Sequence, residues 1–358
     1  MDDKIEEILA QYPVQIESRK RIRGAILLET REGQYLLREY NGSASHLERE
    51  ERIKESLMSH GYRKVDKALA NKQGELLTRD GSGNIWLMKR WFAGRECDLK
   101  DAKQVCRAMS HLAMLHLWMS EQQEVDIRTQ QTENAEELTS SGRETDLGRE
   151  ELQAAEVTAF TPIDFFGRRN RELKRVHTYI RKKRRKNEME LALLDAFAHY
   201  YEQGCEAEQL ETAEHNYDYL QREAVEQGKL MHGSYNYHNV FLDVGNGGNA
   251  VTNFEKCHND CQVADLYQFL RKVMEKHDWN INVAYRLVDE YDRLKPLEDD
   301  DIDMLVTLLS FPEKFWKIIN QYYNAGKAWV PAKNIDKLKI VIEQNMRRRE
   351  LIDKMCGM

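Results

Sequence analysis

Residues 231–242 read MHGSYNYHNVFL, and residues 251–255 read VTNFE. Three glycines lie between these stretches, at positions 245, 247 and 248, and indicate a turn. The apolar runs on either side of this turn predict two strands, and a polar loop lies at the outer end of each strand. We therefore predict a β-hairpin whose two outer loops, residues 232–239 and 253–255, meet at one end.

The residues before this hairpin, from about 21 to 90, follow a strand, helix, strand order. Short apolar runs flank a Glu-Gly turn, which is typical of a first hairpin. Apolar side chains then recur at helical spacing until Gly61, a residue type that commonly ends a helix. The predicted elements are strands at 25–28 and 35–37, a helix at 45–60, and strands at 74–78 and 85–89.

Beyond residue 94 the chain is predicted to be mostly helical. Residues 101–119, 165–201 and 280–355 carry apolar side chains at helical spacing. Residues from about 121 to 157 are instead polar and aperiodic, so they offer little apolar area to offset the entropy of ordering. We expect this segment to be a mobile and dispensable surface insertion.

The basic run Arg181–Lys186 falls in the middle of the helix predicted at 165–201. One interpretation is a patch for an acidic partner, for phosphate or for nucleic acid. The other is a solvated helix face that is balanced by neighbouring acids such as Glu188 and Glu190. The acidic balance of the whole chain favours the second interpretation.

Composition excludes several classes of function. The chain has 358 residues, of which 41% are hydrophobic, and a net charge of -7, so it can fill two lobes but has no general attraction to nucleic acid or anionic lipid. Its six cysteines are scattered, which favours reduced thiols. The acidic N-terminus lacks the apolar run of a signal peptide, and no stretch is long enough to span a bilayer. We expect a cytoplasmic protein without a membrane or nucleic-acid partner.

The hairpin loops resemble those of the aminoglycoside phosphotransferase and choline kinase family. In that family the first loop reads His-Gly-Asp, four residues and Asn, and the second reads Ile-Asp-Phe followed by Asp or Glu. Leu112–His116 resembles its Leu-Ala-x-Leu-His helix, Asp265-Leu266 its helix entry after the metal loop, and Trp86–Gly94 its hinge strand. The tyrosine-rich first loop and Phe311–Trp316 are similar to the CotS group of spore-coat proteins.

This resemblance implies an α+β, two-lobed, protein-kinase-like fold. Residues 1–92 would form a small β-rich N-lobe with one helix, and the hinge would lie near 89–94. Residues 93–358 would form a larger helical C-lobe that contains the catalytic-type hairpin, residues 231–255, and the polar insertion.

The resemblance also implies roles for individual residues. In active relatives the first loop's Asp accepts the proton of the attacking hydroxyl, while the Asn and the second loop's Asp bind magnesium. A helix glutamate, either Glu51 or Glu55, would pair with Arg38. The implied positions are Ser234 and His232 for catalysis, Asp265 as a structural brace, Arg38, Glu55, Lys89 and Trp91 for the nucleotide, and Asn239, Asn253 and Glu255 for the metal.

Three of these positions depart from the family pattern. Ser234 replaces the catalytic Asp, and losing a general base typically costs ~10²–10⁴ in rate. Asn253 replaces the magnesium-binding Asp, so an amide oxygen without charge faces the ion. Arg38 stands where a Lys is expected, and its planar fork is not an isosteric substitute. We expect weak binding of ATP and magnesium.

Three functions therefore remain in competition. The leading one is a catalytically degenerate kinase-fold protein that acts by binding in spore-coat assembly, with coat proteins, or a nucleotide or small molecule in the interlobe cleft, as partners. The second is an active phosphotransferase for small hydroxyl compounds that uses Glu255 and Asn239. The third is a binder of an acidic polymer through Arg181–Lys186.

Overall fold

The computed structural model describes residues 2–121, 162–214, 216–245, 247–324 and 332–356. The chain divides into two compact units. The sheet unit consists of Met1–Gln122 and His232–His258, and the helical unit consists of Gln123–Met231 and Asn259–Met358. Apart from Glu121, the insertion predicted at about 121–157 lies outside the described residues. The lobe boundary predicted near residue 92 stays a prediction.

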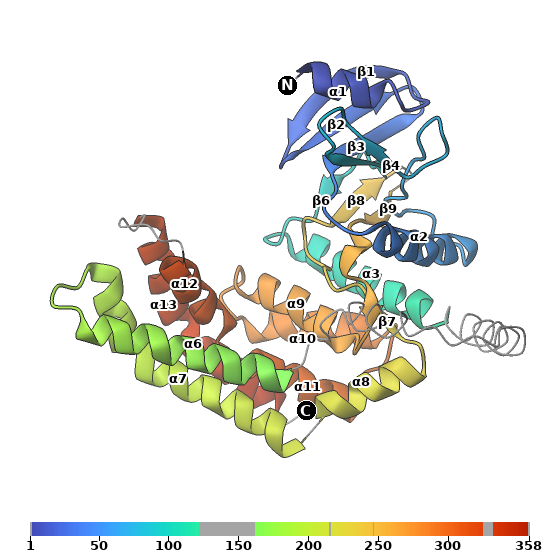
Figure 1. Ribbon diagram of the computed structural model, residues 1–358. Coiled ribbons are helices and arrows are strands. Elements are labelled where there is room, and N and C mark those ends of the chain that lie inside the picture. Colours follow the sequence, from blue (N-terminus) through green and yellow to red (C-terminus); the bar gives the residue numbers. More distant parts are fainter. Residues whose placement is uncertain (1, 122–161, 215, 246, 325–331, 357–358) are drawn as a thin grey trace, which may run out of the picture. The chain divides into compact units, whose positions relative to one another are not determined.

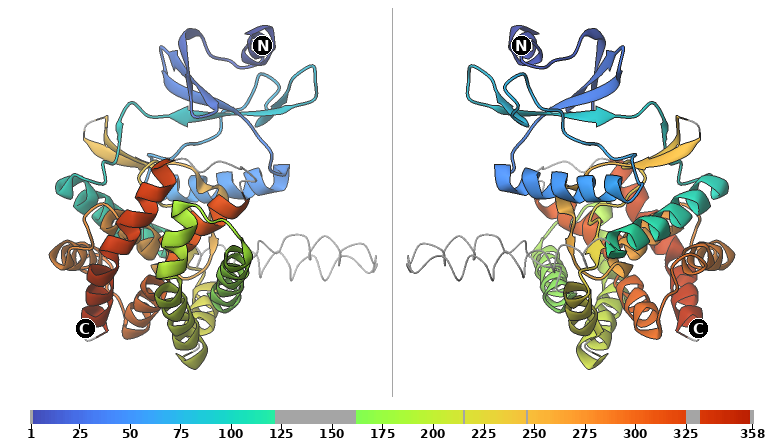
Figure 2. Two further views of the ribbon diagram at one scale, coloured as in Figure 1. Left: turned by 90° about the vertical axis from the view of Figure 1, so that its left-hand side faces the viewer. Right: turned by 90° about the vertical axis from the view of Figure 1, so that its right-hand side faces the viewer.

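An antiparallel five-stranded sheet forms the first part of the sheet unit. Its strand order is β1-β2-β3-β5-β4, and the strands predicted from the sequence are all present. Helix α1 (Asp2–Leu9) lies across one face, where Ile8 packs with Leu28, Leu37 and Met88 (Figure 2). The strands are β1 (Ile16–Ile22), β2 (Ala25–Thr30), β3 (Gly33–Glu39), β4 (Leu77–Arg79) and β5 (Ile85–Trp91).

Two of these elements were not predicted from the sequence. Strand β1 lies at the edge of the sheet, and its side chains are exposed or only half-buried. Its sequence therefore lacks the alternation that identifies a half-buried strand. Helix α1 is only eight residues long, too short for its periodicity to stand out from its acidic composition.

The opposite face of the sheet carries charged residues. Antiparallel pairing places Leu36 opposite Lys89 and Arg38 opposite Leu87. Residues two apart in a strand share a face, so Arg38 and Lys89 project from the same side. Helix α2 (Ala44–Ser59) follows, and its N-cap Ser43 accepts a hydrogen bond from the amide of His46.

The predicted hairpin is present in the sheet unit. Strand β6 (Arg95–Glu96) pairs with β8 (Val240–Val244), which pairs with β9 (Gly248–Val251). A single turn of 3-10 helix, η1 (Phe254–Lys256), follows β9, and α2 contacts it. Helix α3 (Ala102–Glu121) completes the unit and confirms the helix predicted at 101–119. The chain passes between the units at β7 (Leu230–Met231) and β10 (His258–Asn259).

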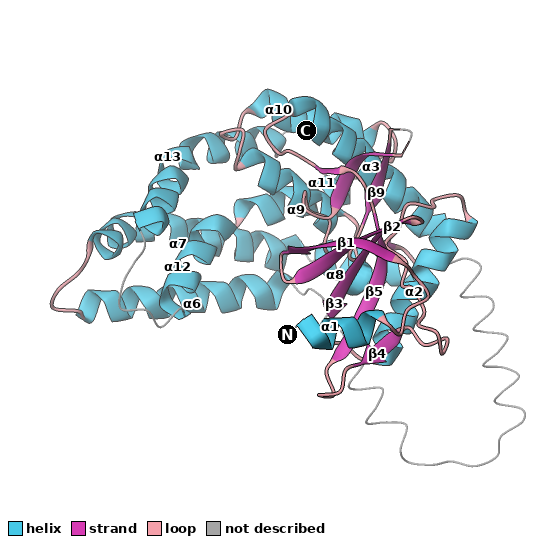
Figure 3. Cartoon of the chain, turned by 90° about the horizontal axis from the view of Figure 1, so that it is seen from above, coloured by secondary structure: helices cyan, strands magenta, loops and turns pink. Residues whose placement is uncertain are grey.

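The helical unit is built on the antiparallel pair α6 (Pro162–Lys182) and α7 (Glu188–Glu214), which run side by side (Figures 1 and 3). One core of this unit contains Phe197, Tyr200, Phe315 and Leu338. The helical block predicted at 280–355 is confirmed. The remaining helices are α8 (Asn216–Glu226), α9 (Val263–Met274), α10 (Ile281–Asp292), α11 (Asp299–Ser310), α12 (Glu313–Asn324) and α13 (Ala332–Met355).

The single helix predicted at 165–201 is wrong in one respect, because the chain turns between Lys182 and Glu188. The cause is a reciprocal cap. The side chain of Asn187 accepts from the amide of Glu190 at 2.9 Å, and the Glu190 carboxylate accepts from the amide of Asn187 at 3.0 Å. The basic run therefore lies at the end of α6 and in the following turn, not in mid-helix.

The described cysteines are all free thiols, and most of them are buried. Burial raises the pKa of Cys97 to about 12, so this thiol stays protonated. No helix among the described residues is long and apolar enough to cross a membrane.

Candidate functional site

The first loop of the hairpin packs tightly against the second. Gly233 has a φ of 71°, and a β-carbon there would lie 2.3 Å from the carbonyl oxygen of Lys256. Only glycine fits this approach. His232 is fully buried, and its Nδ1 accepts a hydrogen bond from the amide of Ser234 at 3.2 Å. The histidine ring also stacks edge-on against Phe254. His232 therefore holds the backbone of this loop in shape.

The carbonyl oxygen of Ser234 organises the rest of the first loop. It accepts from the side-chain amides of Asn236 at 3.0 Å and Asn239 at 2.8 Å. The backbone oxygen of Asn239 in turn accepts from the amide of Thr252 at 3.0 Å. The two predicted polar loops are thus brought together, with Asn239 between Ser234 and the start of the second loop.

Asn253 occupies the second loop in a left-handed conformation, with a φ of 70°. Asparagine tolerates this region better than most residues. Its amide donates to the Asp66 carboxylate at 2.9 Å. Its side-chain oxygen is buried and finds no hydrogen-bond partner among the described residues, so this oxygen is a candidate acceptor for a water or a ligand donor.

Arg38 forms an ion pair with Glu255. The prediction that Arg38 pairs with Glu51 or Glu55 is therefore wrong. Glu51 pairs instead with Lys54 at 2.8 Å, and the exposed Glu55 pairs with Lys67 at 2.7 Å. Lys54 of α2 pairs with both inward-facing acids of the same helix, Glu50 and Glu51, so neither of them pairs with Arg38 of β3.

A buried charge cluster lies between α2 and the charged face of the sheet. Lys54 contacts Glu50 at 2.6 Å and Asp66 at 3.2 Å. Lys89 contacts Glu50 at 2.7 Å and Asp66 at 3.5 Å. The cluster comprises Glu50, Glu51, Lys54, Asp66 and Lys89, all of them buried.

Mutual neutralisation keeps this cluster ionised. Burial opposes the charge of Asp66, but Lys54 and Lys89 outweigh it and lower the Asp66 pKa. The same two lysines lower the pKa of Glu50 against the effect of burial. Burial lowers the pKa of Lys89, and the nearby Asp66 offsets only part of this effect. Breaking such a cluster would leave an uncompensated buried charge, which typically costs about 3–5 kcal/mol.

A glutamate of α2 does pair with a cation of the sheet, as the resemblance implied, but the two residues are Glu50 and Lys89 of β5. Lys89 is only 2% exposed, so it supports the fold of the site. Sequence reasoning missed Glu50, Lys54 and Asp66. The spacing of Glu50 and Lys54, four residues apart on one helix, was a usable signal, whereas nothing in the sequence singled out Asp66.

Two other predicted residues are not members of this cluster. Trp91 ends β5 and contacts Phe241 edge-to-face, with ring centroids 5.3 Å apart. Asp265 is buried in the first turn of α9, in the helical unit. Their predicted roles, at the nucleotide and as a brace, stay predictions.

The residues of the two loops do not fit a magnesium ion well. Magnesium sites normally use one or two carboxylates. Asn239 and Asn253 contribute amide oxygens only, and Glu255 is engaged by Arg38. Within the described part of the chain, no group of three or more His, Cys, Asp or Glu side chains could hold a metal.

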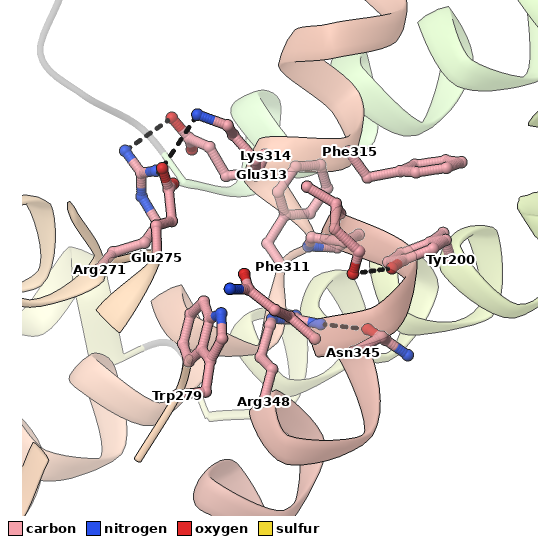
Figure 4. Close-up of a pocket in the computed structure, with 13 residues that line it drawn as sticks. Tyr200, Arg271, Glu275, Trp279, Phe311, Glu313, Lys314, Phe315, Asn345 and Arg348 are labelled. Carbon is pink, nitrogen blue, oxygen red and sulfur yellow. Dashed lines mark hydrogen bonds and ion pairs between the residues drawn. The ribbon is translucent and has the colours of Figure 1, made fainter. Parts of the chain in front are cut away.

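The helical unit contains a small cavity of its own, lined by residues of α7, α9, α12 and α13 (Figure 4). Its volume is about 30 Å³, which is room for roughly two waters. Arg348 lies at one side and donates to the carbonyl oxygens of Leu309 and Ser310 at the end of α11. Burial lowers the pKa of Arg348 to about 10. Arg348 therefore acts as a helix cap, and the cavity is too small for a nucleotide.

Several solved structures of phosphotransferases share this fold. An aminoglycoside phosphotransferase from Alicyclobacillus acidocaldarius matches with a TM-score of 0.77 and 15% identity over 98% of this chain and 95% of that one. A spectinomycin phosphotransferase solved with ADP and spectinomycin matches with a TM-score of 0.63 and 11% identity over 100% of this chain and 98% of that one. A microcompartment-associated aminopropanol kinase matches with a TM-score of 0.55 and 12% identity over 99% of this chain and 98% of that one. The chain thus has the α+β fold of the aminoglycoside phosphotransferases.

The family can be stated more narrowly. The model of the family described as "Spore coat putative kinase YutH" matches residues 122–355. The chain belongs to this spore-coat family, and the predicted kinship with kinase-like coat proteins is confirmed. No curated protein matches the chain.

Proposed function

We propose that this protein is a binding component of the spore coat that has the phosphotransferase fold but does not transfer phosphate efficiently. It would reside in the coat and contact other coat proteins. A nucleotide or small molecule could still bind at the two hairpin loops. The observation that carries the proposal is the ion pair between Arg38 and Glu255.

This ion pair removes the last free carboxylate from the metal positions. With Asn239 and Asn253 supplying only amide oxygens, Glu255 is the one anionic group of the set. Arg38 neutralises it, so a magnesium ion would have to compete with a guanidinium that is already in place. Phosphoryl transfer depends on metal ions to neutralise charge that develops on the phosphates.

Ser234 adds a second, independent deficit. Its hydroxyl cannot accept a proton as a carboxylate does, so the step that activates the substrate hydroxyl lacks a base. A phosphate could still be attracted by Arg38. Binding without metal would then be separated from catalysis, because ground-state affinity alone does not raise turnover.

The test is a calorimetric titration with ATP, with and without magnesium, followed by an assay for ADP release over a panel of amino alcohols and aminoglycosides. We expect no more than a marginal effect of magnesium on affinity and negligible turnover. The double substitution Ser234→Asp and Asn253→Asp should introduce magnesium-dependent binding, because it restores both missing carboxylates. Robust turnover by the unmodified protein that Glu255→Ala abolishes would establish the active phosphotransferase instead.

A further inference from the structure

The turn between α6 and α7 is a concentrated site of positive charge. Six consecutive cations, Arg181–Lys186, occupy the last turn of α6 and the loop that follows. Arg181, Lys182, Arg184 and Arg185 are exposed. Figure 3 shows that α6 and α7 lie side by side, so their connecting loop forms the end of a helical hairpin. We call residues 181–186 the basic tip.

The acids next in sequence do not balance this tip. Glu190 pairs with Lys183 at 2.5 Å and also caps α7. Glu188 is engaged by Lys339 of α13 at 2.8 Å. The four exposed cations of the tip form no ion pair with any described residue. Of the neutralisation by Glu188 and Glu190 that the sequence predicted, only the pair of Glu190 with Lys183 therefore forms.

Helix electrostatics account for little of this charge. The carboxyl end of a helix carries the equivalent of about half a negative charge, which favours one or two cations in the last turn. Six cations exceed that demand several-fold. A large excess of exposed charge of one sign marks a surface that attracts an oppositely charged partner.

The chain itself contains a segment of matching opposite charge, residues 298–303, which read EDDDID. Glu298 and Asp301 form the capping box at the start of α11. Asp299 and Asp303 are exposed and Asp300 is half-buried, and none of the three forms an ion pair with a described residue. We call residues 298–303 the acidic segment.

One copy of the protein cannot join these two features, because they belong to different ends of the helical unit. The basic tip precedes Glu188, the first residue of α7. Arg348 links the carboxyl end of α11 to Gln203, fifteen residues further along α7, or about 22 Å. From this contact α11 runs along α8, the helix that follows the other end of α7. The amino end of α11, which carries the acidic segment, therefore lies away from the basic tip.

We propose that the basic tip of one copy binds the acidic segment of a second copy, so that the protein associates head to tail. This contact is heterologous, since each copy uses one surface as donor and a different surface as acceptor. Heterologous contacts that do not close into a ring extend into open assemblies. The inference goes beyond the proposed function, because it holds whether or not the hairpin loops transfer phosphate.

Sedimentation velocity at low and high salt tests the proposal on the full-length protein. We expect the mean size to grow with concentration at about 0.05 M salt and to fall to that of the monomer at about 1 M, where charges are screened beyond about 3 Å. Arg184→Glu with Arg185→Glu should weaken association by at least about tenfold, and so should Asp299→Lys with Asp300→Lys. An equimolar mixture of the two reversed variants should associate again, because each charge reversal complements the other.

The matched control reverses two exposed cations of the same helix away from the tip, Lys174→Glu with Arg175→Glu, and should associate as the unmodified protein does. If the acidic-segment variant folds poorly, the tip variant still decides the outcome. Its two substitutions lie in a loop and do not alter the first turn of a helix. A protein that is monomeric at all concentrations in low salt overturns the proposal. So does a tip variant with undiminished association, or a tip that binds a nucleic-acid oligomer while self-association is absent.

Discussion

At the scale of single residues, Arg38 has opposite consequences for a phosphate and for a metal. A guanidinium attracts phosphate oxygens, yet it also neutralises a carboxylate that it contacts. In this chain the contacted carboxylate is Glu255, which follows the asparagine of the second loop by two residues. Arg38 therefore keeps a positive charge beside the second hairpin loop but weakens the metal position there.

Replacing Arg38 should separate these two effects. Arg38→Gln frees Glu255, so the affinity for magnesium should rise by about tenfold, an estimate that allows for the partial exposure of both side chains. Affinity for nucleotide without metal should fall. Magnesium titration by calorimetry measures the first effect and ADP titration in chelator the second. Arg31→Gln, which removes an exposed arginine paired with Glu17, is the control and should change neither. An unchanged magnesium affinity in Arg38→Gln would show that Glu255 is not a latent ligand.

The residues of the site were predictable to different degrees. The loop positions Ser234, Asn239 and Asn253 follow from the spacing of one contiguous stretch, and the structure brings them together. The partner of Arg38 was not predictable, because it depends on which of several carboxylates reaches β3 in three dimensions. The buried cluster around Lys89 was missed for the same reason, since its members come from α2, β5 and a loop.

At the scale of elements, periodicity identified the strands and helices that have one buried face. It failed where burial leaves no pattern, as in the edge strand β1, and where local capping overrides periodicity. Residues 165–201 look like one helix because apolar side chains recur at helical spacing on both sides of Lys183. The cap formed by Asn187 and Glu190 divides them.

The strength of that cap can be measured. Asn187→Ala removes the side chain that accepts from the amide of Glu190 and should lower the free energy of unfolding by about 1 kcal/mol. Asn187→Asp keeps an acceptor at the same place and should retain most of the stability. Urea denaturation followed by circular dichroism provides the comparison. If Asn187→Ala were as stable as the unmodified protein, the break between α6 and α7 would need another cause.

At the scale of the whole molecule, the net charge of -7 conceals an uneven distribution. The sheet unit contains a buried cluster of mutually neutralised charges, whereas the helical unit gathers six cations, four of them exposed, in one turn and five acids, three of them exposed, at the start of α11. Net charge argued against a nucleic-acid partner, but it could not reveal that charges of opposite sign gather at different ends of one unit. That arrangement appears only when the helices are placed.

Head-to-tail association makes a prediction that other modes of association do not share. Neutral substitutions remove one surface without creating a new one, so Arg184→Gln with Arg185→Gln leaves a copy that offers only its acidic segment. Asp299→Asn with Asp300→Asn leaves a copy that offers only its basic tip. Each variant alone should be monomeric at low salt, and an equimolar mixture should stop at a complex of two copies, because neither free end can extend it. Light scattering coupled to size exclusion measures the mass directly. A two-fold symmetric contact through the same two surfaces would instead stop the unmodified protein at two copies, and a mixture that grows beyond two copies would show that surfaces other than these two carry the assembly.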